Sequence, residues 1–273
     1  MHFKKSNTNH STVLHQEEVP YLTFKKLDQA GVTHGFSTRQ GGVSEGIYAS
    51  MNLSYNRGDE KAAVDENFRR IGQAIGFDSG KLVFSNQVHG TQIHKVTEDD
   101  CGKVMTNMDG LVTNVKGIPM YTGYADCVPL FFYDPSREVA AMAHSGWRGT
   151  VGRIGAKMIG VMETEYGCRR EDIIAAVGPS ICKDCYEVSE DVAEAFKKEF
   201  KEWHWEEYLE EKGDGKYQLD LWKVNETMLL GAGITREHLD VTDLCTCCNH
   251  EYLFSHRASH GKRGNLGAFI VLS

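Results

Sequence analysis

Cys127 and His144 are the two residues whose types and spacing most clearly point to chemistry. The stretch between them reads as two short strands around a turn. Residues 128–133 are apolar and aromatic, and residues 138–143 are mostly apolar and small. The sequence Asp-Pro-Ser-Arg at 134–137 is typical of a turn, because proline fixes φ and aspartate bonds to its own backbone. The pattern therefore predicts a β-hairpin that carries both residues.

A four-residue turn sets the register of this hairpin and places Tyr133 opposite Glu138, and Cys127 opposite His144. Opposed residues on antiparallel strands point to the same face, with Cβ atoms about 5 Å apart. A thiolate and an imidazole at that separation can hold one metal ion or form a nucleophile–base pair. A one-residue slip would send them to opposite faces, so the prediction depends on the register.

A third metal ligand is needed if the pair binds a metal, and His89 is the candidate. It follows an expected strand over 81–87 and precedes Gly90, where a side chain can point out of a sheet edge. A lone histidine at such a place is more often structural, so its candidacy depends on the incomplete pair. His94 is the rival, although it lies in the alternating run 91–96 that is typical of a half-buried strand.

The sequence Ser-Gly-Trp-Arg-Gly at 145–149 is a candidate anion site. It precedes a helix expected over 150–166, and free N–H groups at the start of a helix attract anions. Ser145, Gly146 and Arg148 could therefore bind phosphate, with Arg148 as a bidentate donor. A tight turn between a strand and a helix, with its tryptophan in the core, explains the same residues equally well.

Arg39 and Asp126 are further candidates with ordinary structural alternatives. Arg39 precedes two glycines, which indicates either a turn with a solvated arginine or an arginine held to meet an anion. Asp126 could orient a metal ligand or transfer a proton, although a strand at this point would turn its side chain away from Cys127. Three further acids near turns read as solvated or capping residues: Asp99, Asp100 and Asp109.

Five of the 8 cysteines form two groups, C-x-x-C and C-x-C-C, about 60 residues apart: Cys182, Cys185, Cys245, Cys247 and Cys248. They could form a structural zinc site, but C-x-C-C is not the usual spacing, and buried thiols are the alternative. The chain has no His-x-His pair of the kind a multi-copper cluster needs. It also lacks a complete zinc-deaminase signature, a G-x-S-x-G elbow, a phosphate-binding P-loop and a dinucleotide fingerprint.

Composition limits the class of protein. The chain has 273 residues, of which 41% are hydrophobic, and a net charge of −8, which argues against nucleic-acid binding. No run of about 18 apolar residues predicts a membrane helix, and the first residues lack a secretory pattern. We therefore expect a cytoplasmic protein with reduced thiols, a loose arm over 1–18 and a single domain over 19–273.

The rest of the sequence predicts helices and strands around the candidate site. Helices are expected over 59–75, 189–200 and 219–230, each with apolar residues on one face and two of them ending before a glycine. Further strands are expected over 21–27, 111–115, 119–123, 171–177, 241–248 and 267–272, and residues 201–216 read as an exposed excursion.

Seven motifs occur together from about residue 20 onward: RQGG (39–42), QVHG (87–90), ADCVP (125–129), AHSGWRG (143–149), GPSI (178–181), CYEV (185–188) and FSHR (254–257). This combination resembles the YfiH/YlmD family, whose members are often described as polyphenol oxidoreductases or laccase-like. The resemblance implies an α+β fold with mixed sheets packed together and flanked by helices. It also implies one zinc ion per chain, with His89, Cys127 and His144 as its ligands.

The same resemblance implies an enzyme of nucleoside metabolism. Phosphorolysis of adenosine, inosine, guanosine or methylthioadenosine would give the free base and ribose 1-phosphate, and adenosine deamination is attributed to the same site. Cys127, His89, His144 and Arg148 would then carry catalysis. Three alternatives stay open: a metal-free Cys–His hydrolase acting on a peptide-like or cell-wall precursor, a purine-sensing module, and a copper-binding polyphenol oxidase, since two His and one Cys also accept copper. The oligomer is expected to be a monomer or a homodimer.

Overall fold

The predicted hairpin lies at the centre of the computed structural model, which describes residues 1–273. It consists of β9 (Val128–Asp134) and β10 (Val139–Ser145). Successive side chains of β9 point into two different hydrophobic cores. Leu130 and Phe132 lie in one core, and Phe131 lies in the other. A strand that is buried on both faces needs apolar side chains at every position, which explains the continuous apolar run.

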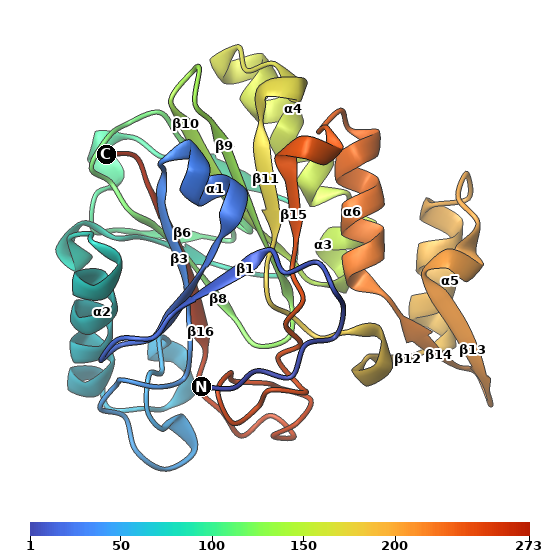
Figure 1. Cartoon of the computed structure of the whole chain (residues 1–273), viewed down its shortest axis with the longest axis horizontal. Coiled ribbons are helices and arrows are strands. Elements are labelled where there is room, and N and C mark those ends of the chain that lie inside the picture. The colour runs from blue at the N-terminus through green and yellow to red at the C-terminus, as the bar shows by residue number, and fades with distance from the viewer.

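The hairpin belongs to a mixed six-stranded sheet with the order β15-β11-β9-β10-β7-β5. Its other strands are β5 (Ile93–Lys95), β7 (Gly110–Thr113), β11 (Ile174–Val177) and β15 (Leu239–Val241). The outer face is covered by α3 (Trp147–Val151), α4 (Ile154–Tyr166) and α6 (Leu221–Gly231), which lie together on one side in Figure 1. Buried residues of α4 and α6 share one core with this sheet.

The inner face packs against a seven-stranded sheet with the order β1-β2-β3-β16-β8-β4-β6. Its strands are β1 (Thr12–His15), β2 (Tyr21–Phe24), β3 (Thr33–Ser37), β16 (Leu266–Val271), β8 (Met120–Tyr124), β4 (Val83–Asn86) and β6 (Val104–Thr106). Helix α2 (Lys61–Ile75) covers the other face of this sheet, opposite the α3, α4 and α6 side (Figure 1). The predicted α+β fold of mixed sheets flanked by helices is therefore confirmed.

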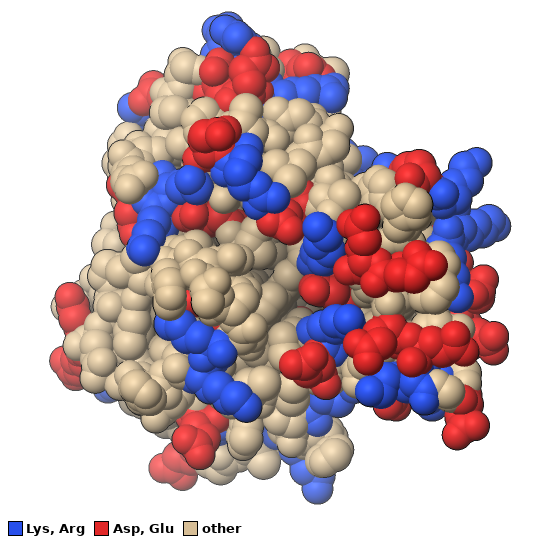
Figure 2. All heavy atoms as spheres, turned by 45° about the vertical axis from the view of Figure 1, so that its right-hand side comes forward, with Lys and Arg blue, Asp and Glu red and all other residues tan.

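Two smaller parts complete the fold. Helix α1 (Lys25–Ala30) follows β2 directly, so the strand expected over 21–27 is shorter and ends at Phe24. A three-stranded sheet of β12 (Glu187–Ser189), β14 (Lys216–Leu219) and β13 (Leu209–Gly213) lies beside α5 (Glu190–Glu199). Acidic and basic side chains intermingle over this right-hand part of the surface in Figure 2. No helix has the length and apolar character that crossing a membrane requires.

Several sequence predictions are confirmed at the level of elements. Helix α2 buries Val64, Phe68 and Ile71, as the spacing predicts, and ends at Gly76, whose φ of 98° suits glycine. The helices expected over 189–200 and 219–230 are α5 and α6, and the last strand is β16.

The predicted register of the central hairpin is wrong by one residue on each strand. Asp134 pairs with Val139, and His144 pairs with Pro129 instead of Cys127. The reason lies in the turn: the Asp134 carboxylate accepts N–H bonds from Ser136 and Arg137 at 2.8 and 3.1 Å, which keeps Asp134 as the last residue of β9. The combined shift is two residues, so it preserves the faces on which side chains lie.

Other predictions differ from the structure in local detail. Residues 1–18, expected to be a loose arm, include β1, which pairs with β2, and Asn7 donates to the Thr242 carbonyl at 2.9 Å. The helix expected over 150–166 is split, because Arg153 has a φ of 56° between α3 and α4. The excursion over 201–216 contributes β13, and the strand expected over 241–248 ends at Val241.

Candidate metal centre and its cavity

His89, Cys127 and His144 come together from three separate elements. His89 follows β4 in a turn, Cys127 lies between β8 and β9, and His144 lies within β10. Their potential ligand atoms all lie within 4.8 Å of one another. The His89 and His144 rings meet edge to face, with centroids 4.8 Å apart. Because His144 is buried and His89 is exposed, the group opens to solvent on the His89 side.

Two residues with positive φ aim these ligands. His89 has a φ of 60°, and Asp126, immediately before Cys127, has a φ of 86°. Both values fall in the left-handed region, which non-glycine residues adopt uncommonly and mostly in turns. Such conformations cluster at functional sites, where the surrounding structure holds them in place.

Gly146 permits this close approach. A Cβ atom at Gly146 would lie 3.0 Å from the Cys127 Sγ atom and 3.1 Å from Cδ2 of His89. Real Cβ atoms rarely come so near to other heavy atoms, so the site needs glycine here for space. Its φ of −67° is ordinary, and conformational freedom is not the reason.

Asp109 orients two of the three candidate ligands. Its buried carboxylate accepts a bond from Nδ1 of His144 at 2.8 Å, which leaves Nε2 of that ring free to bind. The same carboxylate accepts the N–H groups of Val88, His89 and Gly90 at 3.1, 3.0 and 2.8 Å. Burial opposes its ionisation, but the bonds from His144 and these N–H groups outweigh burial and lower the pKa of Asp109.

Sequence reasoning missed the functional role of Asp109, which it read as a solvated or capping acid. The residue does cap a turn, but it is fully buried. Asp109 lies directly before β7, and β7 pairs with β10 in the sheet. This pairing brings Asp109 beside His144, and it is not visible in the local sequence.

The charges of Cys127 and His144 depend on each other. Burial disfavours the Cys127 thiolate, but the charge of His144 and hydrogen bonds from both histidines lower the pKa of the thiol to about 6. Burial likewise disfavours the His144 imidazolium, but the Cys127 charge and the bond to Asp109 raise its pKa to about 9. The pair therefore favours an ionised sulfur, which is the form that binds metals or attacks electrophiles.

A cavity of about 600 Å³ is lined in part by His89, Cys127 and His144. Aromatic side chains form part of its wall: Tyr55, Phe68, Phe84 and Tyr121. Arg57 and Arg263 also line it, and the Nε atoms of both are buried without a hydrogen-bond partner. Burial, and next the nearby charge of Arg57, lower the pKa of Arg263 to about 10. Two cations with unsatisfied donors make this part of the cavity suitable for an anion.

The residues that the sequence singled out for phosphate lie outside this cavity lining. The Arg39 guanidinium donates to the carbonyls of Ala49 and His250, at 2.7 to 3.0 Å, and lies over the Phe254 ring. Arg148 stacks on Trp147, with its guanidinium carbon 4.3 Å from the ring centroid.

Ser145 is also occupied within the fold. Its hydroxyl is fully buried and bonds to Thr150 and Asn225, each at 2.9 Å. Gly146 contributes space beside Cys127. The structure thus separates the 145–149 turn from the two arginines that face the cavity, and sequence reasoning did not single out either arginine.

Asp126 and His94 have roles away from direct ligation. Asp126 accepts from the Thr246 hydroxyl at 2.6 Å and from the Arg257 N–H at 2.7 Å, so its carboxylate ties the Cys127 segment to a distant loop. His94 bonds to Asp100 at 3.0 Å near the surface and is absent from the group around Cys127.

The donor set decides which metals the site fits. Two imidazoles and one thiolate, with an open side, suit a three-ligand zinc site that keeps its fourth position free. A multi-copper centre needs several further histidines nearby, and His89 and His144 are the only histidines in this group. The residues therefore fit a single zinc ion and do not fit a copper cluster.

Comparison with known proteins shows extensive similarity. Residues 33–273 match a family model described as multi-copper polyphenol oxidoreductase laccase. The chain is 36% identical to purine nucleoside phosphorylase YlmD from Geobacillus stearothermophilus, over 94% of this chain and 96% of the relative. It is 33% identical to adenosine deaminase RL5 from an unknown prokaryotic organism, over 86% of this chain and 94% of that protein.

Solved structures agree with these matches. The crystal structure of a hypothetical protein YfiH from Bacillus licheniformis superposes with a TM-score of 0.90 at 32% identity, covering 95% of this chain and 99% of the other. That of YlmD from Geobacillus stearothermophilus gives a TM-score of 0.88 at 33% identity, covering 96% and 99%.

Proposed function

Since this chain belongs to the YfiH/YlmD family of laccase-like polyphenol oxidoreductases, we propose that it is a zinc-dependent purine nucleoside phosphorylase that also deaminates adenosine. Relatives named purine nucleoside phosphorylase support an enzyme acting on a nucleoside and phosphate. The relative named adenosine deaminase supports the second activity. Adenosine, inosine, guanosine and methylthioadenosine are the proposed nucleosides.

The observation that carries this proposal is the convergence of His89, Cys127 and His144 beneath a cavity that also holds two arginines. The three side chains would hold the zinc ion. When bound in such a three-ligand site, zinc supplies a Lewis acid at its open position and lowers the pKa of a bound water to about 7.

The cavity offers separate surfaces for base and phosphate. Phe84 and Tyr121 lie on the aromatic wall, which suits the flat face of a purine. Arg57 and Arg263 line the same cavity, and their positive charges would bind phosphate there. In phosphorolysis, a phosphate oxygen bonds to C1′ of the ribose while the bond from C1′ to the purine nitrogen breaks. The base leaves with the electron pair and takes up a proton.

The protein contributes positioning and charge to this reaction. Asp109 fixes the ring orientation of His144 and holds the backbone around His89. The two arginines counter the charge of phosphate and hold it near the ribose. Arg148 remains a proposed contributor from outside the cavity lining.

Product analysis tests the proposal. Zinc-analysed protein is incubated with adenosine, with and without phosphate, and the products are separated by chromatography. We expect adenine only when phosphate is present, and inosine in either case. The variant His89→Ala should lose both activities together, whereas loss of deamination alone would contradict a single shared site. Neither product from zinc-loaded protein would overturn the nucleoside assignment.

A specific observation favours a second candidate, a metal-free Cys–His hydrolase. Cys127, His144 and Asp109 form a chain in which a carboxylate orients the imidazole beside a thiol, as in nucleophilic enzymes. Mild alkylation distinguishes the two. A hydrolase would lose activity when Cys127 is alkylated and would keep it when metal is removed by a chelator. The zinc enzyme would show the reverse once loaded with zinc.

A further inference from the structure

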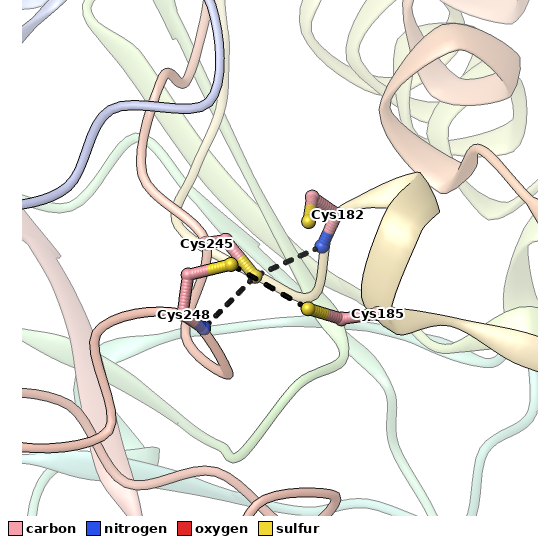
Figure 3. A group of neighbouring side chains, drawn as sticks. All are labelled: Cys182, Cys185, Cys245 and Cys248. Atoms are coloured by element: carbon pink, nitrogen blue, oxygen red, sulfur yellow. Dashed lines mark hydrogen bonds between the residues drawn. The ribbon is translucent and has the colours of Figure 1, made fainter.

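Four cysteines form a second cluster, distinct from the group around Cys127. Cys182 and Cys185 follow β11, and Cys245 and Cys248 follow β15. Figure 3 shows the two pairs on facing segments of the chain. Their four Sγ atoms all lie within 4.8 Å of one another, and those of Cys185 and Cys248 are 3.5 Å apart.

The spacing of the cysteines becomes regular when Cys247 is left out. Cys247 is not one of the four, so the second group is Cys245-x-x-Cys248 and matches Cys182-x-x-Cys185. Two C-x-x-C pairs are the usual ligand pattern of four-thiolate zinc sites. The adjacent Cys247 concealed this pattern, because the sequence reads as C-x-C-C when all three thiols are counted.

The backbone around the cluster is arranged to stabilise charged sulfur. The N–H groups of Cys182 and Cys248 both donate to the Cys245 Sγ atom, at 3.2 and 3.4 Å. The Cys185 N–H donates to the Cys182 carbonyl at 3.1 Å, which closes the first C-x-x-C turn. Hydrogen bonds from N–H groups to ligand atoms are the supporting interactions expected around a metal.

The distances fit a tetrahedral ion. Zinc–sulfur bonds of about 2.3 Å place sulfur atoms about 3.8 Å apart in a tetrahedron. The Sγ atoms of Cys185 and Cys248 are 3.5 Å apart and all the separations lie within 4.8 Å, so small side-chain movements give this geometry. Cys182 and Cys245 are buried, while Cys185 and Cys248 are half-buried, so the group is closed on one side and reachable on the other.

We propose that Cys182, Cys185, Cys245 and Cys248 bind a structural Zn²⁺ ion as four thiolates. A closed set of four protein ligands leaves no open position, so this ion stabilises the fold and takes no part in turnover. It joins the loop after β11 to the loop after β15, two segments about 60 residues apart in the sequence. The proposal is independent of the proposed nucleoside activity.

The four-cysteine cluster is also connected to the group of His89, Cys127 and His144. Arg257 donates through its guanidinium to the Cys185 carbonyl at 3.1 Å and through its backbone N–H to Asp126 at 2.7 Å. The Thr246 hydroxyl, inside the second C-x-x-C pair, donates to the same carboxylate. Asp126 immediately precedes Cys127, so the four-cysteine loops support the segment that carries the first site.

Metal analysis of matched variants tests the inference. The protein is purified under reducing conditions without chelator, and its zinc content is measured by inductively coupled plasma mass spectrometry. The double variant Cys185→Ser/Cys248→Ser should lose one equivalent of zinc and unfold at a lower temperature. The control Cys247→Ser changes the neighbouring thiol and should keep the wild-type zinc content. Equal zinc in the double variant and in wild type would overturn the proposal.

A second measurement covers the case in which the double variant does not fold. His89→Ala removes a ligand of the first site, so metal retained by this variant reports on the cysteine cluster. Reconstitution with Co²⁺ should then give the intense sulfur-to-cobalt charge-transfer absorption of a tetrahedral four-thiolate site. Absence of this absorption, iron in place of zinc, or a mass showing that these cysteines form disulfides would each overturn the assignment.

Discussion

Replacing Asp109 with asparagine should weaken metal binding by His89, Cys127 and His144. The substitution keeps size and shape but removes the charge and one acceptor oxygen. In the wild type, Oδ1 accepts from His89 N–H and His144 Nδ1, and Oδ2 accepts from Val88 N–H and Gly90 N–H. Asparagine can serve only one of these pairs, and its amide would face the donors of the other.

The cost follows from these four bonds. A hydrogen bond to a charged group contributes about 1.5–3 kcal/mol, so two lost bonds lower the free energy of unfolding by about 3–6 kcal/mol. That is a large part of the roughly 5–15 kcal/mol by which folded proteins are stable. Loss of a residue that orients a ligand typically lowers metal affinity by about tenfold to a hundredfold. We expect both effects in Asp109→Asn.

The assay measures zinc affinity by competition with a chromophoric chelator, alongside unfolding in urea. Asp100→Asn is the matched control, because Asp100 also bonds to a histidine, His94, but near the surface. This half-buried pair is separate from the group around Cys127, so the control should bind zinc as wild type does. If Asp109→Asn is folded and binds zinc as tightly as Asp100→Asn, the role assigned to Asp109 is refuted.

Three further predictions concern space, charge and burial. Gly146→Ala should lower zinc affinity, because its Cβ would meet the metal-site thiol at 3.0 Å, whereas Gly160→Ala in α4 meets nothing within 4 Å and should leave it unchanged. Arg263→Gln should raise the KM for phosphate by about tenfold, the effect of about 1.4 kcal/mol, and spare phosphate-independent deamination; the exposed Arg236→Gln is its control in the same kinetic assay. Asn225→Ala should lower the free energy of unfolding in urea by about 2–4 kcal/mol, because two buried hydroxyls lose a partner. Unchanged affinity, KM or stability, respectively, would contradict each prediction.

The central elements could be predicted from the sequence because their patterns are local. The apolar runs around Asp134 predict a hairpin, and the i, i+4, i+7 spacing of Val64, Phe68 and Ile71 predicts α2. The hairpin register was missed because it depends on which residue caps the turn, and the Asp134 side chain decides that. The pairing of β1 with β2 was missed because the first residues are polar and have no apolar periodicity.

The site could be predicted only in part, for a related reason. Cys127 directly precedes the hairpin that carries His144, so the sequence brings them close even with the register shifted by two residues in total. Asp109, Arg57 and Arg263 reach the site from distant parts of the chain, and nothing in their local sequence indicates it. Long-range strand pairing places them, and periodicity does not report on such pairing.

The group around Cys127 and the four-cysteine cluster are connected through Asp126, and this connection explains why Asp126 is buried. A buried carboxylate needs hydrogen-bond donors, and Asp126 finds them in Thr246 and Arg257, on the loop that carries one half of the four-cysteine cluster. That loop forms no regular strand, and it is joined to the segment after β11 by the bond from the Thr246 N–H to the Ser180 carbonyl at 3.1 Å. A zinc ion bound by the four cysteines would hold this loop in place, and the loop in turn holds Asp126. Asp126 has a left-handed conformation, which sets the direction of the adjacent Cys127. The geometry of the group around Cys127 is therefore coupled, through Asp126, to the loop that carries Cys245 and Cys248.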